Sequence, residues 1–249
     1  MELIAVEVAE TAAARVRRTV GREQVARVKS TPTDVVTDAD LSAEKFIRER
    51  LASLVPGSGF VGEELEERIG DSAVSWVIDP IDGTVNFFFG IPLAAVSIGA
   101  TVDDEVVAGA VVSIYQPEVY SASAGRGARL NGQPIGVRDG GDLSQALIAT
   151  GFSYDEALRG RQGEMIHRLL PLVRDVRCFG SAALQLCWLA CGRLDGYYES
   201  DLRYWDFAAG ALIAAEAGAR VQAPEANGAN LLISARPDLF DGLSHALGV

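Results

Sequence analysis

The sequence lacks the residues that mark several large classes of protein. Its 249 residues include only three cysteines and two histidines. So few cysteines exclude a disulfide framework, and neither histidine lies at ligand spacing from a cysteine, which excludes an ordinary zinc site. The longest apolar runs, such as 207–215, fall well short of the ~20 residues that cross a bilayer, and no signal-peptide core opens the chain. We therefore expect a globular cytoplasmic protein with buried thiols.

Positive charge is also scarce. Lysine and arginine together number 22 against 34 aspartates and glutamates, which gives a formal net charge of −12. Recognition of nucleic acids and anionic membranes rests on lysine and arginine, so the composition disfavours both as partners. The charge disfavours phosphate esters as well, unless the acids gather around divalent cations that make a local cleft attractive to phosphate.

The chain is long enough to bury a large core, and 49% of its residues are hydrophobic. The residue pattern changes near position 144. Helical spacing and then a run of β-rich segments predict an α+β half over 1–143, whereas alternating strands and helices predict an α/β half over 144–249. We expect the two halves to form one catalytic unit around a shared cleft. We predict a first helix that ends near Gly21 and further helices over 41–54, 163–173, 181–190 and 206–217. The predicted strands include 94–102, 106–114 and 119–122.

Two aspartates stand three residues apart on a turn that follows a buried, β-branched run at 76–78. Pro80 cannot donate a hydrogen bond to a sheet and Gly83 permits unusual dihedral angles, so we expect the strand to end there. Hard divalent cations prefer carboxylate and carbonyl oxygens, so Asp79, Asp82 and the Ile81 carbonyl are candidate ligands. An Asp-Pro-x-Asp-Gly sequence is equally typical of a plain turn, and that alternative stays open at this point.

A short helix that begins after this turn would add an anion-binding site beside the cations. Gly83 and Thr84 would then offer free main-chain N–H groups, which suit the oxygens of a phosphate ester.

Other acids are candidates with ordinary alternatives. Glu63 and Glu64 follow a glycine and an apolar pair, but they also begin an acidic run that favours solvent. Asp38 or Asp40 can cap the helix predicted over 41–54. Asp206 opens an apolar helix, where a capping role is again the alternative.

Several of these stretches together resemble the inositol monophosphatase family. Residues 76–87 are similar to its first signature, a tryptophan followed by Ile-Asp-Pro-x-Asp-Gly-Thr-x-Asn-Phe. Residues 205–218 are similar to its second, Trp-Asp-x-Ala-Ala-Gly followed by an apolar run and Glu-Ala-Gly. A Gly-Glu-Glu at 62–64 and the Lys-Ser and Thr-x-x-Asp elements upstream complete the family order. The chain departs from the family in having Ala219 after Gly218 and in the run Phe87 to Phe89.

The resemblance implies a layered α-β-α-β-α sandwich of the inositol monophosphatase and fructose-1,6-bisphosphatase type. It also implies a magnesium-dependent phosphoric monoester hydrolase that holds two or three Mg²⁺ ions. The metal ligands it implies are Glu63, Asp79, Ile81 through its carbonyl, Asp82 and Asp206. The catalytic residues it implies are Glu63, Thr84 and Asp79. The residues it implies beside the metal ligands, without direct contact to the metal, are Lys29, Asp34, Asp40 and Glu64.

The substrate-binding residues that the resemblance implies are Gly83, Thr84, Gly180, Ser181, Ala182, Glu199 and Asp206. Glu199 suits the hydroxyl groups of a polyol, and a carboxylate there would oppose a second substrate phosphate. We therefore expect myo-inositol monophosphate first, with fructose 1,6-bisphosphate and histidinol phosphate as alternatives. A homodimer and sensitivity to lithium follow from the same resemblance. The non-enzymatic alternative is a regulatory protein that binds a macromolecule through the same fold.

Overall fold

The computed structural model describes residues 1–21, 25–28, 35–224 and 230–249. Lys29 and Asp34, two of the residues predicted to lie near the metal ligands, fall outside this part of the chain. No helix within the described ranges is long and apolar enough to cross a bilayer.

Residues 59–135 form a seven-stranded sheet in which each strand pairs with the next along the chain. The first pair is parallel, and all the others are antiparallel. In spatial order the strands are β3 (Gly59–Gly62), β4 (Val74–Asp82), β5 (Ala95–Val102), β6 (Glu105–Ser113), β7 (Val119–Ser123), β8 (Ala128–Leu130) and β9 (Gln133–Ile135).

Residues 147–235 supply a second, five-stranded sheet. Its order is β11 (Asp175–Cys178), β10 (Leu147–Thr150), β12 (Gly196–Ser200), β14 (Leu231–Ala235) and β13 (Arg220–Gln222). The first three run parallel, so their carboxyl ends meet at one edge. All strands of the larger sheet precede residue 144 and all strands of the smaller sheet follow it. The division of the chain into two halves at that point stays a prediction.

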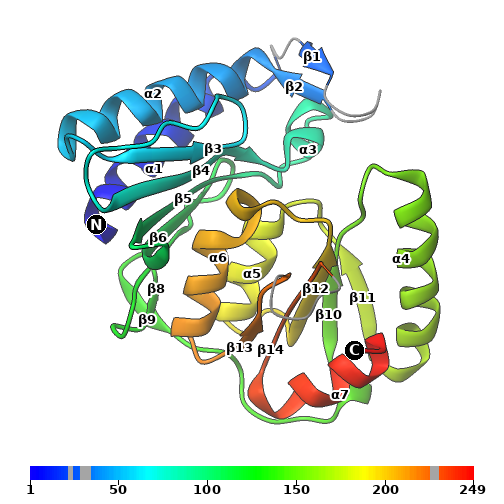
Figure 1. Ribbon diagram of the computed structural model, residues 1–249. Coiled ribbons are helices and arrows are strands. Elements are labelled where there is room, and N and C mark those ends of the chain that lie inside the picture. Colours follow the sequence, from blue (N-terminus) through cyan, green and yellow to red (C-terminus); the bar gives the residue numbers. More distant parts are fainter. Residues whose placement is uncertain (22–24, 29–34, 225–229) are drawn as a thin grey trace.

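The helices lie in three layers around the two sheets, as Figure 1 shows. α1 (Glu2–Arg17) and α2 (Asp38–Leu54) cover the outer face of the larger sheet, and α5 (Ala182–Ala190) and α6 (Tyr204–Glu216) lie between the sheets. α4 (Glu156–Leu169) and α7 (Pro237–Leu247) cover the far side of the smaller sheet, on a core that includes Ile148 and Leu243. The remaining short elements are β1 (Val25–Val28), β2 (Val35–Thr37), α3 (Thr84–Phe88), η1 (Leu143–Gln145) and η2 (Leu170–Leu172). The predicted α-β-α-β-α sandwich is confirmed.

Small residues let the middle layer approach closely. A Cβ atom on Gly109 of β6 would lie 3.0 Å from the Cα of Ala209 in α6, and one on Gly210 would lie 2.9 Å from Leu186 of α5. Both helices are apolar around most of their circumference because sheets cover them on two sides.

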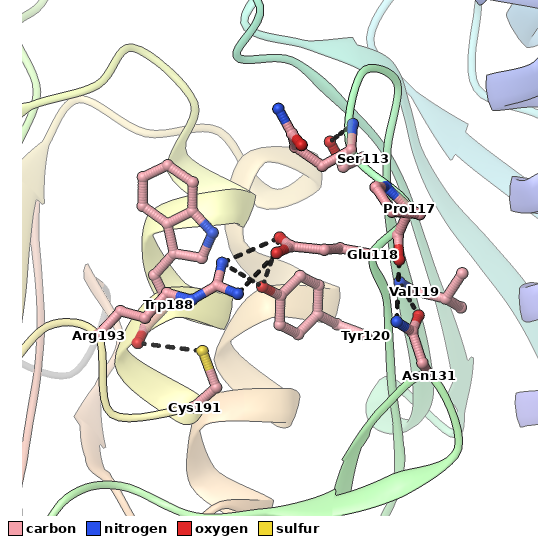
Figure 2. A network of polar contacts seen from close by, with 10 residues as sticks. Ser113, Pro117, Glu118, Val119, Tyr120, Asn131, Trp188, Cys191 and Arg193 are labelled. Carbon is pink, nitrogen blue, oxygen red and sulfur yellow. Dashed lines mark hydrogen bonds and ion pairs between the residues drawn. The ribbon is translucent and has the colours of Figure 1, made fainter.

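The far end of α5 is tied to the larger sheet by a charged network (Figure 2). Arg193, just past the helix, donates to both carboxylate oxygens of Glu118 at 2.6 and 3.0 Å. Tyr120 of β7 donates to the same carboxylate at 2.9 Å. This network closes the interface between the layers at the end of α5 that lies away from the cleft described below.

Two predictions about elements were wrong. β4 does not end at Ile78 but continues to Asp82, with an irregular register between Asp79 and Asp82 that accommodates Pro80. The helix predicted over 163–173 begins seven residues earlier, because Asp155 caps it by accepting the Leu158 N–H at 2.8 Å.

Candidate active site

A cavity of about 880 Å³ is lined by residues from the edges of both sheets and the helices between them, and most of the predicted site residues line it. The larger sheet contributes the two aspartates of β4 and Glu63, which directly follows β3. The smaller sheet contributes the loops at the carboxyl ends of its parallel strands, where ligands commonly bind in α/β sheets. The predicted residues that line it are Glu63, Asp79, Ile81, Asp82, Gly83, Thr84, Gly180, Ser181, Ala182, Glu199 and Asp206.

The irregular end of β4 aims its two aspartates into this cavity. Asp79 accepts the Ile81 N–H at 3.0 Å, which turns the chain within the strand. Gly83 then adopts a φ of 96°, and a Cβ atom there would lie 2.9 Å from the Leu93 carbonyl. Only glycine meets both demands, so the turn between β4 and α3 depends on it.

Glu63 reaches the same place from β3. Its N–H donates to the Ile78 carbonyl at 3.2 Å, so its side chain lies beside Asp79 across the parallel pair. The chain just beyond it is held by Glu44 of α2, a fully buried acid that accepts the Glu64 N–H at 2.7 Å. A Cβ atom on Gly62 would lie 2.2 Å from that carboxylate. The Glu44 carboxylate can therefore approach the chain at this point only because residue 62 is a glycine. Arg48 pairs with Glu44 at 2.6 Å and offsets its charge.

The carboxyl groups of the cavity raise one another's affinity for protons. Burial raises the pKa of Asp79 well above its usual range, and the charges of Glu63, Asp82 and Asp206 raise it further. Burial and the charge of Glu63 likewise raise the pKa of Asp206. Interaction with Glu63 through a hydrogen bond also raises the pKa of Asp79. When all of these carboxyl groups are ionised, the cluster carries more negative charge than the surrounding side chains offset.

The chemistry of these donors fits a hard divalent cation. They are oxygen atoms of carboxylates plus one carbonyl, and their mutual repulsion is what a cation relieves. No three histidine, cysteine, aspartate or glutamate side chains in the described ranges already surround a point where an ion would sit.

Asp82 has a second function that the sequence did not reveal. Its carboxylate accepts the N–H groups of Ala182 and Ala183 at 3.0 and 2.9 Å, and also the Ser181 hydroxyl. It therefore binds the N-terminus of α5 and joins this helix to the larger sheet. The Ala182 N–H and the Ser181 hydroxyl, which we expected to face the substrate, are already engaged by this aspartate.

Thr84, the first residue of α3, is linked to Asp40 of α2. Its hydroxyl lies 3.1 Å from the Asp40 carboxylate and 2.9 Å from the Ile81 carbonyl, two acceptors for its single hydrogen. Asp40 in turn accepts the N–H and the hydroxyl of Thr37, the residue before α2. Asp40 thus takes part in capping its helix, as one alternative held, and also faces the cleft residue Thr84.

Asp206, like Asp40, takes part in capping a helix and also faces the cavity. It is the third residue of α6, and its carboxylate accepts the Arg203 N–H at 2.6 Å. One oxygen is used for the cap, while the side chain lines the cavity near Glu63 and Asp82.

Sequence reasoning missed the outer wall of the cavity. The loop 151–155 and Arg159 of α4 line it, as does Cys178 at the end of β11. The loop is held in place because the Ser153 hydroxyl donates to Asp201 at 2.6 Å and the Ser153 N–H donates to Gln162 at 3.0 Å. A glycine, serine and aspartate loop between a strand and a helix was the available signal, but the sequence alone did not show that the strand before it is parallel to its neighbours.

Known proteins resemble this chain over most of its length. The model of the inositol monophosphatase family matches residues 1–244. Inositol-1-monophosphatase SuhB of Mycobacterium tuberculosis strain H37Rv is 51% identical over 233 residues, which cover 89% of this chain and 80% of that protein. A crystal structure of extragenic suppressor protein suhB from Bartonella henselae has a TM-score of 0.93 at 35% identity, covering 98% of this chain and 97% of that one. The structure of Mycobacterium tuberculosis SuhB has a TM-score of 0.85 at 45% identity, covering 99% and 94%.

Proposed function

This chain belongs to the inositol monophosphatase family, and on that premise we propose that it is a magnesium-dependent phosphatase that hydrolyses myo-inositol monophosphate to inositol and phosphate. The observation that carries the proposal is the uncompensated cluster of Glu63, Asp79, Asp82 and Asp206 in one cavity with Glu199. A relative of 51% identity bears the name inositol-1-monophosphatase, which supports the choice of substrate.

The carboxylates of Glu63, Asp79, Asp82 and Asp206 and the Ile81 carbonyl would hold two or three Mg²⁺ ions. When bound, the ions supply Lewis-acid stabilisation of the charge that develops on the phosphoryl group and on the leaving oxygen.

The chain's own residues would handle the attacking water. The single hydrogen of the Thr84 hydroxyl is directed to Asp40 or to the Ile81 carbonyl. Its oxygen is thereby left to accept a hydrogen bond from the water, while Glu63 accepts the proton that the water loses. The main-chain N–H groups of Gly83 and Thr84 would bind the phosphoryl oxygens. Attack would be in line, without a phosphoenzyme.

Glu199 would select the alcohol part of the substrate by accepting a hydrogen bond from a ring hydroxyl. Burial raises its pKa to about 7, although a hydrogen bond from Tyr197 works in the opposite direction. Around neutral pH a large share of Glu199 is thus available as an anion. Fructose 1,6-bisphosphate is the weaker candidate because its second phosphate would approach this acid and Asp201.

The test is phosphate release from a panel of four substrates: myo-inositol monophosphate, fructose 1,6-bisphosphate, histidinol phosphate and 3′-phosphoadenosine 5′-phosphate. We expect the first to give the highest kcat/KM with Mg²⁺ and no release in excess chelator. Full activity in chelator would refute the metal mechanism. No release from any member, with Mg²⁺ present, would favour the non-enzymatic alternative of a regulatory binding protein.

We further propose a cytoplasmic homodimer that uses the apolar segment at the end of α3 and just beyond it, residues 87–91. Phe87 is buried in the core, but Phe89 is 72% exposed and Ile91 45% exposed. None of the three belongs to the cavity lining, so a subunit contact is the better use of this segment. Phe89→Ser should shift the mass measured by light scattering from dimer to monomer, and an unchanged mass would place the contact elsewhere. Lithium inhibition is proposed from family membership alone.

A further inference from the structure

The carboxylate of Glu199 has two close neighbours. The hydroxyl of Tyr197 donates to its Oε2 at 2.6 Å. Gly151 lies against the same carboxyl group, because a Cβ atom there would come within 2.0 Å of Oε2 and 2.3 Å of Oε1. The side chain thus packs against a phenol hydroxyl and a bare stretch of backbone, and it cannot move further toward Gly151.

Tyr197 itself is rigid. It is fully buried between the smaller sheet and α5, in a cluster that includes Leu186 and Leu232. Residues two apart in a strand share a face, so Tyr197 and Glu199 of β12 point the same way. The hydroxyl therefore has a fixed position from which to donate, and the ring pays no new conformational cost when a substrate arrives.

The two carboxylate oxygens of Glu199 differ in their hydrogen-bond partners. Oε2 accepts from Tyr197, whereas no donor to Oε1 is found among the residues that the structure describes. Glu199 lines the cavity. One oxygen is thus committed to the protein and the other is left for a hydroxyl of the substrate.

We propose that Tyr197 is a positioning residue for substrate selection, because its hydroxyl holds Glu199 with one oxygen directed at the alcohol part of the phosphate ester. This inference rests on the proposed function for the identity of the substrate, but not for the contact itself. The ligand class is a phosphomonoester with a free hydroxyl on the ring or chain that bears the phosphate.

The electrostatics around Glu199 agree with this role. Burial and the charges of Asp82 and Asp201 favour its protonated form, and the charge of Glu199 in turn raises the pKa of Asp206. Cys178 also faces it. The hydrogen bond from Tyr197 opposes these groups, so it helps to keep Glu199 an acceptor as well as holding it in place.

Tyr197→Phe tests the proposal, since it removes one oxygen and keeps the ring. The two substrates to compare are inositol monophosphate and 4-nitrophenyl phosphate, which offers no hydroxyl. We expect KM for inositol monophosphate to rise about tenfold, ~1.4 kcal/mol, with kcat nearly unchanged and both constants for the aryl phosphate unaffected.

Tyr198→Phe is the matched control. Tyr198 is the next residue of β12, buried in the cluster on the opposite face of the sheet. The two variants have the same change in composition, and both should melt close to the wild type. Tyr198→Phe should leave both substrates unaffected.

A double mutant separates positioning from a general effect on folding. In a Glu199→Gln background, Tyr197→Phe should add little to the loss of inositol monophosphate binding, because both changes act on one contact. Gly151→Ala should reproduce the Tyr197→Phe selectivity, since the new methyl group displaces the same carboxylate.

Three results would overturn the proposal. Equal losses on both substrates would make Tyr197 structural, no change on either would show that Glu199 is held by other means, and additivity with Glu199→Gln would show that the two act independently. If the wild type releases no phosphate from inositol monophosphate, the proposed substrate is wrong. The same variants are then compared on the best hydroxyl-bearing substrate of the panel, where the same selectivity is expected.

Discussion

Each end of α5 lies near a carboxylate on the side of the larger sheet, but the two acids have different hydrogen-bond donors around them. At the N-terminal end, Asp82 accepts N–H and hydroxyl donors and no arginine or lysine pairs with it in the described ranges. At the C-terminal end, Glu118 is paired with Arg193 through both oxygens (Figure 2).

The pKa values of the two acids move in opposite directions. Burial raises the pKa of Asp82 to about 6, although the donors from α5 lower it. Burial also raises the pKa of Glu118, but the hydrogen bonds from Arg193 and Tyr120 outweigh it and the net pKa lies below the usual range. An acid that serves only the fold is neutralised within the chain. The acids of the cavity are left uncompensated, which is the condition for binding a cation from outside.

The strongest test of this contrast is Asp79→Asn. It removes a charge that the proposed cations require, so we expect phosphate release to fall below detection. The same change removes the repulsion between Asp79 and the acids Glu63, Asp82 and Asp206, so the metal-free protein should melt no lower than the wild type. Wild-type turnover at low Mg²⁺ would show that Asp79 is not a ligand.

Thr84→Ala should have the next largest effect. Losing the hydroxyl that orients the attacking water should lower kcat by about 10²-fold or more. The binding of Mg²⁺ should change little, and calorimetric titration with Mg²⁺ checks this. An unchanged kcat would assign the orienting role to another group.

Glu199→Gln should affect substrate choice rather than chemistry. An amide cannot replace the ionised acceptor, so KM for inositol monophosphate should rise about tenfold or more, ~1.4 kcal/mol per decade. Hydrolysis of 4-nitrophenyl phosphate should survive. Equal losses for both substrates would tie Glu199 to the cation cluster instead.

The acids at the two ends of α5 should also contribute differently to the pH dependence of stability. A carboxyl group whose pKa is raised on folding stabilises the protein below its unfolded pKa and loses this contribution as pH rises through the folded value. With Asp82 at about 6, lowering the pH from 7.5 to 5 in chelator should add about 1.4 kcal/mol from this group alone. The melting temperature should therefore rise by a few degrees, and Mg²⁺ at pH 7.5 should also raise it. A fall in the metal-free melting temperature over this range would contradict the interpretation.

Glu118→Gln should give the smallest effect. Because its folded pKa is lowered, its contribution is present at neutral pH and is lost only in acid. The pair is partly exposed, so the cost should be about 1 kcal/mol or less, on the order of 2–4 °C in melting temperature. The values of kcat and KM should stay at wild-type levels. A loss of activity would mean that this network reaches the cleft.

Much of the fold followed from local patterns, because helices and strands with one buried face repeat at 3.6 or 2 residues. The strands of the meander and the helices α2, α5 and α6 were predicted within a few residues of their bounds. α4 was misplaced because Gly160 and Gly163 interrupt the helical pattern and its cap, Asp155, was not recognised. The end of β4 was misplaced because Pro80 favours a turn locally, whereas pairing with β5 carries the strand past it.

The sequence by itself determined which side chains can do chemistry. Two short signatures, read through a family resemblance, identified the acids at 79, 82 and 206, and Glu199 followed from the same comparison. These residues sit in stretches whose turns and helix starts are specified by neighbours a few positions away.

Only the tertiary structure decided what each acid is bonded to. Asp82 binds a helix that begins 100 residues later, Glu44 supports the segment after Glu63, and Gly151, just past β10, lies against Glu199 of β12. Such contacts join residues that are distant in sequence, and their geometry depends on how whole sheets and helices pack. The identity of a carboxylate is therefore local information, whereas its charge state, its free oxygen and its partner belong to the assembled fold.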